Sequence, residues 1–298
     1  MNAQSHKLIT YTAFSKHKQG GNPAGVVPDC HGLTPCQMQD IAQKAGYSET
    51  VFIRTSQKAD YCFRYFTPVL EVPACGHATL AGLTYLKNTE LLKTSTGNLD
   101  TPGGVIHFRI HRKTGHIYIQ QAKPEFGSIV EPDSIADSLG ISQEDLTPDL
   151  PIQCVSTGLW DILIPVKSKN ILMGLQPDMD RIERISRDYQ ATGYHVFAPG
   201  DEKYTAYCRN FAPAAGIPEE AATGTASGAL YAYLNNYLST IPKRCIFSQG
   251  SNLNRPSEIY VFSESTNSDS PALWIGGHAL PVETHIIHIN NHKKFDFK

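Results

Sequence analysis

Cys75-Gly76-His77-Ala78-Thr79 decides how this chain is interpreted, because a degenerate copy, Thr223-Gly224-Thr225-Ala226-Ser227, follows in its second half. A glycine that opens a helix exposes backbone N–H groups, and two such openings can hold one anion between them. The copies differ where chemistry would take place, since the first carries a thiol and an imidazole and the second carries two threonines. The pattern predicts two related halves around one shared site.

The repeat extends upstream of both glycine motifs. Arg64-Tyr65-Phe66-Thr67-Pro68 matches Arg209-Asn210-Phe211-Ala212-Pro213. Still further upstream, Gly46-Tyr47 and Gly193-Tyr194 each precede an apolar Val-Phe pair. Three matched blocks in the same order indicate an internal duplication rather than chance similarity.

A helix is predicted before each Gly-Tyr pair. The first has Thr34 as its N-cap, proline at the first helical position and Gln37 three residues after the cap, and it ends at Gly46. The second is predicted over residues 177–190, with Gly193 as its stop.

Short apolar or alternating runs predict the strands. They comprise residues 51–53, a hairpin of residues 105–111 and 117–119 that turns at Gly115, and residues 161–166 and 258–262. The Ala- and Leu-rich runs 78–86 and 226–238 predict helices that are buried on most sides. The polar residues 263–270 predict a loop.

These elements predict an α+β fold of two pseudo-symmetric domains, each a rolled mixed or antiparallel sheet around a central helix. We place the first domain at residues 1–127 and the second at residues 128–298. The last strand of the second domain is a candidate to cross back to the first. No long linker separates the two halves.

The composition excludes several classes of protein. The 298 residues are 41% hydrophobic and 18% charged, with a net charge of −2 and no basic block, so neither nucleic acid nor a membrane surface is an expected partner. Residues 8–14 are too polar for a signal peptide, and no apolar run is long enough for a membrane span. Seven cysteines without a C-x-x-C pair predict reduced thiols in a cytoplasmic protein.

Glu49 is the candidate general acid/base. It lies between Gly46-Tyr47 and the apolar run 51–53, and in the second copy residues 48–50 are replaced by His195 alone. Burial at the mouth of an apolar strand would raise the pKa of such a carboxyl group toward the working range. The alternative interpretation is a surface glutamate at the start of a strand.

Cys75 and His77 flank Gly76 at a predicted helix start. A neutral imidazole there can donate to a substrate or relay a proton, and it can equally bond a nearby carbonyl group with no catalytic role. A mechanism with two opposed thiols needs a second thiol at Thr223, and threonine is not an equivalent base near neutral pH. A packed, inert thiol is therefore the better interpretation of Cys75.

Glu219 and Glu220 precede the second glycine motif. One of them can orient an amine or accept a proton. The other interpretation, which applies to at least one of the pair, is an acid that is favourable before a helix N-terminus.

No cofactor or metal site is predicted. The loop at residues 20–25 matches neither a P-loop nor a dinucleotide fingerprint and predicts a tight turn. His285, His288 and His292 lie near the C-terminus, but on a strand over residues 283–289 the first two face opposite sides. A metal site needs convergent ligands, so we expect none there.

Six motifs extend over nearly the whole chain. They are Gly21-Asn22-Pro23-Ala24-Gly25-Val26-Val27, Ser48-Glu49-Thr50-Val51-Phe52, Cys75-Gly76-His77-Ala78-Thr79, Ala222-Thr223-Gly224-Thr225-Ala226, Gln249-Gly250 with Arg255-Pro256-Ser257, and Gly276-Gly277. In this order they resemble the phenazine-biosynthesis PhzF-like family. The resemblance implies a diaminopimelate-epimerase-like fold, with the site in the cleft between the two domains, and a homodimer.

The resemblance also implies a reaction. In the member after which the family is named, it is a cofactor-free isomerisation of trans-2,3-dihydro-3-hydroxyanthranilate, in which a glutamate moves a proton between carbons of the ring. Glu49 falls at that glutamate and His77 at the active-site histidine. Glu220 takes the position of an aspartate, since the usual Glu-Asp-Pro reads Glu219-Glu220-Ala221 here. The positions implied for binding substrate are Ser48 and Gly76 in the first half and Gly224 and Thr225 in the second.

We therefore predict a cofactor-independent isomerase that acts on a small cyclic or amino-bearing carboxylate. The predicted catalytic residues are Glu49, His77 and Glu220. Two alternatives stay open. One is an epimerase or racemase of an amino or hydroxy acid, and the other is a non-catalytic protein that binds a small carboxylate.

Overall fold

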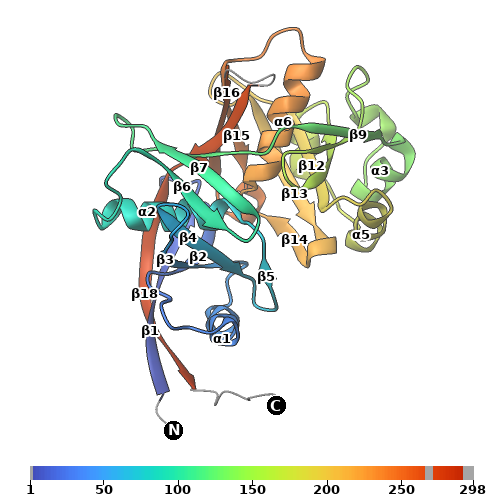
Figure 1. Ribbon diagram of the computed structural model, residues 1–298. Coiled ribbons are helices and arrows are strands. Elements are labelled where there is room, and N and C mark those ends of the chain that lie inside the picture. The colour runs from blue at the N-terminus through green and yellow to red at the C-terminus, as the bar shows by residue number, and fades with distance from the viewer. Residues whose placement is uncertain (1–2, 266–270, 291–298) are drawn as a thin grey trace.

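The computed structural model describes residues 3–265 and 271–290 (Figure 1). The elements of the first half are β1 (Ala3–Ala13), β2 (Asn22–Val27), α1 (Pro35–Ala45), β3 (Thr50–Thr55), β4 (Tyr61–Phe66), β5 (Glu71–Val72), α2 (Gly76–Asn88), β6 (Thr96–Thr101), β7 (Gly104–Ile110) and β8 (Ile117–Gln120).

The second half begins with β9 (Glu125–Ile129). It continues with α3 (Pro132–Leu139), β10 (Gln153–Ser156), β11 (Trp160–Pro165), α4 (Lys169–Gly174), α5 (Met179–Asp188), β12 (Gly193–Pro199), β13 (Ala206–Ala212), β14 (Ile217–Glu220), α6 (Gly224–Tyr237), β15 (Arg244–Gln249), β16 (Ser257–Glu264), β17 (Ala272–Gly277) and β18 (Ala279–Asn290). Three short 3₁₀ turns lie at Gln143–Asp145, Pro213–Ala215 and Ser251–Leu253.

The strands of the two halves pair in the same order and direction. In the first half β1 is antiparallel to β2, β2 parallel to β3, β3 antiparallel to β4, β4 parallel to β6, and β6, β7 and β8 run antiparallel. In the second half β10, β11, β12, β13, β15, β16 and β17 repeat this pattern strand by strand. The repeated pairing is consistent with the predicted pseudo-symmetry, and the α+β prediction is confirmed.

The two sheets join where β8 pairs antiparallel with β17. After each of these strands the chain changes sheets. β9 pairs with β10 of the second half, and β18 pairs with β1 of the first, so the red β18 runs beside the blue β1 in Figure 1. The boundary predicted between residues 127 and 128 falls inside β9, and we propose that the domains divide just before this strand.

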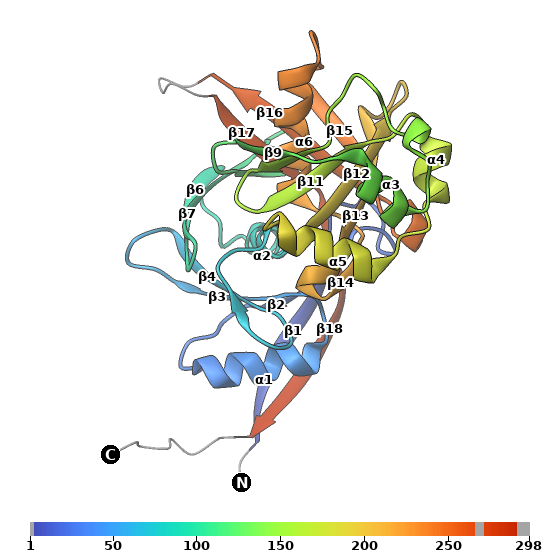
Figure 2. The same ribbon diagram turned by 90° about the vertical axis from the view of Figure 1, so that its right-hand side faces the viewer.

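One helix lies inside each sheet, as the two Ala- and Leu-rich runs predict. α2 and α6 are buried on nearly every side and share one apolar core with the inner faces of both sheets (Figure 2). Smaller cores lie on the outer faces, where α1 covers the first sheet and α3, α4 and α5 cover the second. Successive side chains of a strand point to opposite faces of its sheet and so enter different cores. Val51 packs in the shared core, and Phe52 packs in the core beneath α1.

The first predicted helix is confirmed in detail. Thr34 Oγ1 accepts a hydrogen bond from the backbone N–H of Gln37, whose side chain accepts one from the backbone N–H of Thr34. Gly46 ends α1 with φ of 69°.

The stop predicted for the second helix is wrong. α5 ends at Asp188, and Gln190 reverses the chain with φ of 54°. Gly193 is instead the first residue of β12, where it pairs with Asp161.

The predicted strands and the hairpin at Gly115 are also present. The predicted loop at residues 263–270 begins later, because β16 continues to Glu264, and residues 266–270 lie outside the described residues. No helix in the described ranges is both long and apolar enough to cross a membrane. All seven cysteines are described, and each is free.

A bidentate ion pair occurs at the same place in each half. Arg64 Nε and Nη2 each lie 2.6 Å from the carboxylate of Glu71 and tie β4 to β5. Arg209 Nε and Nη2 each lie 2.9 Å from that of Glu219 and tie β13 to β14. The second pair is the more buried, because its side chains are 7% and 11% exposed, compared with 17% and 31% for the first.

We expect Glu219→Ala to lower the free energy of unfolding by about 3 kcal/mol, because it leaves the buried Arg209 guanidinium without its carboxylate. The matched variant Glu71→Ala is expected to cost about 1 kcal/mol, since its partner is more exposed. Urea unfolding followed by circular dichroism measures both losses. Equal losses would contradict the assignment of different burial to the two ion pairs.

Candidate active site

Glu49 lies directly before β3, and its position is fixed by a hydrogen bond from the backbone N–H of Gly25 to its carbonyl oxygen. The side chain is 13% exposed, and Oε2 lies 3.2 Å from Nε2 of His77. Oε2 is buried and has no hydrogen bond of normal geometry within the described part of the chain. Glu49 is thus not the surface glutamate of the alternative interpretation, and its carboxylate is buried beside the imidazole of His77.

His77, the second residue of α2, lies between carboxylates from the two halves. Its side chain is 5% exposed, and Nδ1 lies 3.8 Å from Oε1 of Glu220. Ser48 Oγ lies 3.3 Å from Nε2, the nitrogen that faces Glu49. The structure therefore brings together the three predicted catalytic side chains, Glu49, His77 and Glu220.

Glu220 ends β14 and accepts hydrogen bonds through both carboxylate oxygens. Asn22 Nδ2 donates to Oε1 at 2.8 Å, and the hydroxyl of Thr223 donates to Oε2 at 2.5 Å. Burial raises the pKa of this carboxyl group, while His77, Thr223 and Asn22 oppose the rise and the charge of Glu49 adds to it. Glu220 is consequently a buried acid that Asn22 and Thr223 fix in place near the imidazole of His77.

The two glycine motifs converge on one side chain. A Cβ atom on Gly76 would lie 3.8 Å from Cδ1 of Ile275, and one on Gly224 would lie 2.5 Å from the same atom. The backbone N–H of Ala78 is used by the sulfur of Cys75, and Thr223 makes no side-chain cap. The N–H groups of Gly76 and Gly224 remain available for an anion on either side of Ile275.

Thr225 follows Gly224 in the first turn of α6, where its carbonyl oxygen accepts a hydrogen bond from Thr157 Oγ1 at 2.9 Å. Glu219, the other acid before the motif, points away from the site toward Arg209. Its ion pair with Arg209, rather than the helix N-terminus, accounts for this residue.

Cys75 Sγ lies 3.4 Å from Nδ1 of His77, and its pKa is raised well above the ordinary value of 9.0, chiefly by burial and then by the charge of Glu49. This direction agrees with an inert thiol. Glu49, Cys75 and His77 each offer one ligand atom within 4.8 Å of the others.

Sequence reasoning missed Asn22, which was assigned to a tight turn. Gly21 does turn there, with φ of 73°, but Asn22 is the first residue of β2 and its amide reaches the other half. Besides Glu220 it contacts the carbonyl oxygen of Ala222 at 3.1 Å and Nδ1 of His77 at 3.4 Å. The available signal was its place in the first family motif.

Asp161 was also missed. It lies on β11, is 2% exposed, and has a pKa raised to about 8, first by burial and then by the charge of Glu220, against a hydrogen bond from Asn210. The signal was the one used for Glu49, namely a carboxylate at the mouth of an apolar run, here residues 162–164.

The alignment of Glu49 with His195 is corrected by the strand register. Thr50 pairs with Phe66, and Tyr194 pairs with the matching Phe211. Glu49 precedes Thr50 as Gly193 precedes Tyr194, so the position of Glu49 is a glycine in the second half.

The C-terminal histidines do not converge in the described residues. His285 Nε2 lies 3.1 Å from Glu283, and His288 Nδ1 lies 2.9 Å from Ser5 Oγ, both on the two-stranded ladder of β1 and β18. His292 lies outside the described residues.

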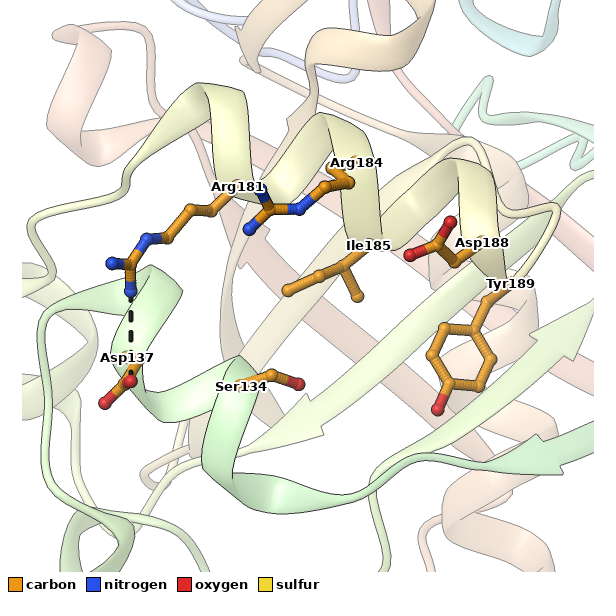
Figure 3. Close-up of a pocket in the computed structure, with 7 residues that line it drawn as sticks. All are labelled: Ser134, Asp137, Arg181, Arg184, Ile185, Asp188 and Tyr189. Atoms are coloured by element: carbon orange, nitrogen blue, oxygen red, sulfur yellow. Dashed lines mark ion pairs between the residues drawn. The ribbon is translucent and has the colours of Figure 1, made fainter.

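A pocket of about 580 Å³ lies between α3 and α5 on the outer face of the second half (Figure 3). It is lined by Ser134, Asp137, Arg181, Arg184, Ile185, Asp188 and Tyr189. Arg181 Nη1 lies 3.8 Å from Asp137 Oδ2 across it, and no predicted site residue lines it. We assign it no part in the chemistry.

Comparison with known proteins agrees with this geometry. The family model PhzC-PhzF, described as phenazine biosynthesis-like protein, matches residues 11–285. The chain belongs to this family. It is 36% identical over 265 residues to the uncharacterized isomerase YfhB of Bacillus subtilis, covering 86% of this chain and 89% of that protein.

A solved structure and a named enzyme extend the likeness. The crystal structure of the Bacillus anthracis phenazine biosynthesis protein of the PhzF family superposes with a TM-score of 0.89 at 30% identity, over 96% of this chain and all of that one. Trans-2,3-dihydro-3-hydroxyanthranilate isomerase of Pseudomonas aeruginosa is 29% identical over 278 residues, or 91% of this chain and 95% of that enzyme. The predictions of a PhzF-like fold and of an isomerase are confirmed.

We expect Asp161→Asn to stabilise the protein more at pH 8.5 than at pH 5. Folding raises the pKa of Asp161 from 3.8 to about 8, so the native state binds this proton more tightly than the unfolded chain does. The stability linked to that proton is complete below pH 3.8 and is lost as the pH rises through about 8. Because asparagine cannot lose a proton, the variant avoids this loss.

Urea unfolding of parent and variant at the two pH values measures the difference. The matched control is Asp137→Asn, whose side chain is 74% exposed and whose effect we expect to be the same at both pH values. A stability difference for Asp161→Asn that does not change with pH would contradict the raised pKa.

Proposed function

We propose that this isomerase moves a proton between carbons of a small carboxylate without a cofactor, and that Glu49 carries the proton. The observation that carries the proposal is the buried Oε2 of Glu49, which has no hydrogen bond of normal geometry within the described residues and lies beside the imidazole of His77. A general base acts best in a site that is largely shielded from water, and this oxygen is buried beside the imidazole.

The proposed steps balance within the substrate and one side chain. Glu49 takes a proton from one carbon, the double bond of the substrate shifts, and Glu49 returns the proton to another carbon. His77 donates to the carboxylate while Glu49 is ionised, and Glu220 accepts from an amino or hydroxyl group of the substrate or through the imidazole. No electron leaves the substrate, which is why the scheme requires no redox group.

The carboxylate of the substrate is proposed to bind between the starts of α2 and α6. Gly76 and Gly224 present free N–H groups there, with Thr225 in the same first turn and Ser48 beside Glu49. Each helix dipole contributes about 0.3–1 kcal/mol to holding an anion. The helix dipoles thus favour a substrate whose carboxylate points at the two helix starts. In that orientation its reacting carbons are directed toward Glu49.

The substrate class follows from a named relative. Trans-2,3-dihydro-3-hydroxyanthranilate, on which the Pseudomonas aeruginosa relative acts by its name, is a cyclic amino-bearing carboxylate of the proposed kind. Here Glu220 and Ala221 stand where the family usually has Asp-Pro. The extra methylene moves the second-half carboxylate by about 1 Å, which can cost about a hundredfold in rate for a positioned reaction. We therefore propose the class, and take this compound as its first member to test.

The alternatives are less well supported. An epimerase needs a second base opposite Glu49, and the nearby thiol of Cys75 is held protonated, with Thr223 at the equivalent position of the other half. A pure binding protein has no need of an ionisable carboxyl group at the position of Glu49. Our proposal also includes a homodimer and activity without a cofactor, which light scattering and assays of the metal-free protein test.

We expect Glu49→Gln to lower proton exchange by on the order of 10²–10⁴-fold, because glutamine has the same shape but cannot take the proton. NMR in D₂O follows deuterium entering trans-2,3-dihydro-3-hydroxyanthranilate and a panel of small cyclic and amino carboxylates. The exposed Glu202→Gln is the control and should exchange like the parent. Exchange that survives in Glu49→Gln would move the base elsewhere, and binding without exchange in the parent would support a binding protein.

We expect Cys75→Ala to lower the same exchange rate by less than about tenfold, because the protonated thiol takes no proton from the substrate in the proposed scheme. The measurement is the D₂O exchange assay, at a pH between 7 and 8. A loss as large as that of Glu49→Gln would instead support the epimerase, with Cys75 as its second base.

A further inference from the structure

Three side chains with different donor atoms converge at the start of α2. Glu49 supplies a carboxylate oxygen, His77 an imidazole nitrogen and Cys75 a sulfur, and the three atoms lie within 4.8 Å of one another. Glu49 Oε2 lies 3.2 Å from Nε2 of His77, and Cys75 Sγ lies 4.0 Å from the same nitrogen. The proposed isomerisation uses the carboxylate and the imidazole and gives the sulfur no task.

The distances fit the ligand shell of a small cation. Around a tetrahedral zinc ion, an oxygen and a nitrogen ligand lie about 3.3 Å apart, and a sulfur and a nitrogen ligand lie about 3.6 Å apart. The distance between the carboxylate and the imidazole is already close to that value. The sulfur, which lies 3.4 Å from Nδ1, needs to approach Nε2 by only about 0.4 Å. A small rotation of the Cys75 side chain therefore completes a shell of three ligands.

The contact between Glu49 and His77 is not a normal hydrogen bond. Oε2 of Glu49 is buried and has no hydrogen-bond partner within the described part of the chain, although Nε2 is 3.2 Å away. A buried carboxylate oxygen without a partner is costly. A cation between the two atoms accepts a lone pair from each, and so it gives the oxygen the partner that it lacks.

The opposite side of the imidazole is arranged as in many zinc sites. A histidine that binds a metal through one ring nitrogen almost always directs its other N–H at a carboxylate, a carbonyl group or water, which orients the ring. Nδ1 of His77 lies 3.8 Å from Oε1 of Glu220, which Asn22 and Thr223 fix in place. The negative charge of Glu220 favours the tautomer with its proton on Nδ1, and that tautomer leaves the lone pair of Nε2 for a metal.

We propose that Glu49, His77 and Cys75 bind one zinc ion or a similar thiophilic dication, and that the bound cation inhibits the isomerase. The inhibition rests on the proposed function, because the cation occupies the carboxylate oxygen that carries the proton in the reaction. On binding, a metal–sulfur bond forms as the thiol releases its proton to solvent, and no electron is transferred. The metal is an inhibitor in this scheme and not a cofactor.

The set of donor atoms selects the class of cation. A thiolate, an imidazole and one carboxylate suit Zn²⁺ and Co²⁺, whereas Mg²⁺ and Ca²⁺ prefer shells made of oxygen atoms. Three protein ligands leave the fourth position of a tetrahedral ion open to water. Glu49 and Cys75 are each partly exposed, so a cation can reach the site from solvent.

The second half does not repeat these ligands. Thr223 and Thr225 stand where the first glycine motif has the thiol and the imidazole, and Gly193 stands where the first half has the carboxylate. Within residues 3–265 and 271–290, no other group of three such side chains converges. We therefore expect one cation for each chain.

Cobalt binding to the metal-free full chain tests the site without any substrate. Co²⁺ takes the place of Zn²⁺ in tetrahedral sites, and a cobalt–thiolate bond produces a charge-transfer band in the near ultraviolet. We expect one equivalent of Co²⁺ to produce this band in the parent and one equivalent of Zn²⁺ to remove it. Cys75→Ser should lose the band, because a hydroxyl group is a poor ligand for these ions. The control Cys36→Ser removes an exposed thiol and should bind as the parent does.

The outer partner of the imidazole gives a second, graded result. We expect Glu220→Gln to keep the band but to bind zinc about 10–100-fold more weakly, as the loss of an outer-shell partner does. A band that is absent from the parent, or one that persists in Cys75→Ser, would overturn the proposal. Cys75→Ala provides the same test if the serine variant does not fold.

Inhibition is measured by the deuterium-exchange assay on chelator-treated protein. We expect zinc to lower the exchange rate of the parent in proportion to the fraction of protein that holds the ion, and EDTA to restore it. In Cys75→Ala the ratio of the rates with and without zinc should stay near one. Unchanged or faster exchange by the parent in the presence of zinc would overturn the inhibition. A parent that exchanges no compound at all counts against the proposed function alone, because the cobalt titration still decides whether the site exists.

Discussion

The antiparallel pairing of β8 with β17 is the constraint on which the rest of the structure depends. It is the place where equivalent strands of the two halves meet, and it brings Ile117 against Gly277 and Ile119 against Ile275. The approach is so close that a Cβ atom at Gly276 would collide with the carbonyl oxygen of Ile117. This seam fixes Ile275 between the first turns of α2 and α6, so two helix N-termini from distant parts of the sequence face one small volume.

The duplicated halves share their scaffold but divide the chemistry. Each keeps an arginine–glutamate pair that ties the strand before the glycine motif to its neighbour. Each has one acid in the site that the other lacks. Glu49 corresponds to Gly193, and Glu220 corresponds to Val72, so a symmetric scaffold yields a site with two unlike walls. The proposed reaction uses this inequality, since Glu49 alone carries the proton while Glu220 on the other wall orients the substrate.

What the sequence could predict followed from local rules. The capping of α1 depends only on Thr34 and Gln37, which lie within four residues of each other. The burial of α2 and α6 follows from their Ala- and Leu-rich composition. Glu49, His77 and Glu220 could be found because each borders a recognisable motif. The stop at Gly193 was predicted wrongly because a glycine that ends a helix and a glycine that admits a neighbouring strand look alike in sequence. Asn22 was missed because its role exists only after β2 has been brought to Glu220.

Asp161, which escaped prediction, belongs to a group of buried polar residues in the second half. Asp161, Asn210 and His195 are buried polar groups where strand register gives the first half alanine, tyrosine and valine, and Nε2 of His195 has no hydrogen-bond partner in the described part of the chain. A buried polar group without its full set of partners destabilises by about 1–3 kcal/mol. Rules based on propensity and hydrophobic patterning predict apolar residues at buried strand positions. They therefore describe the first half well and do not predict the buried polar residues of the second. The duplication supplies an internal reference that a single domain lacks, because the first half shows the equivalent positions packed with alanine, valine and tyrosine.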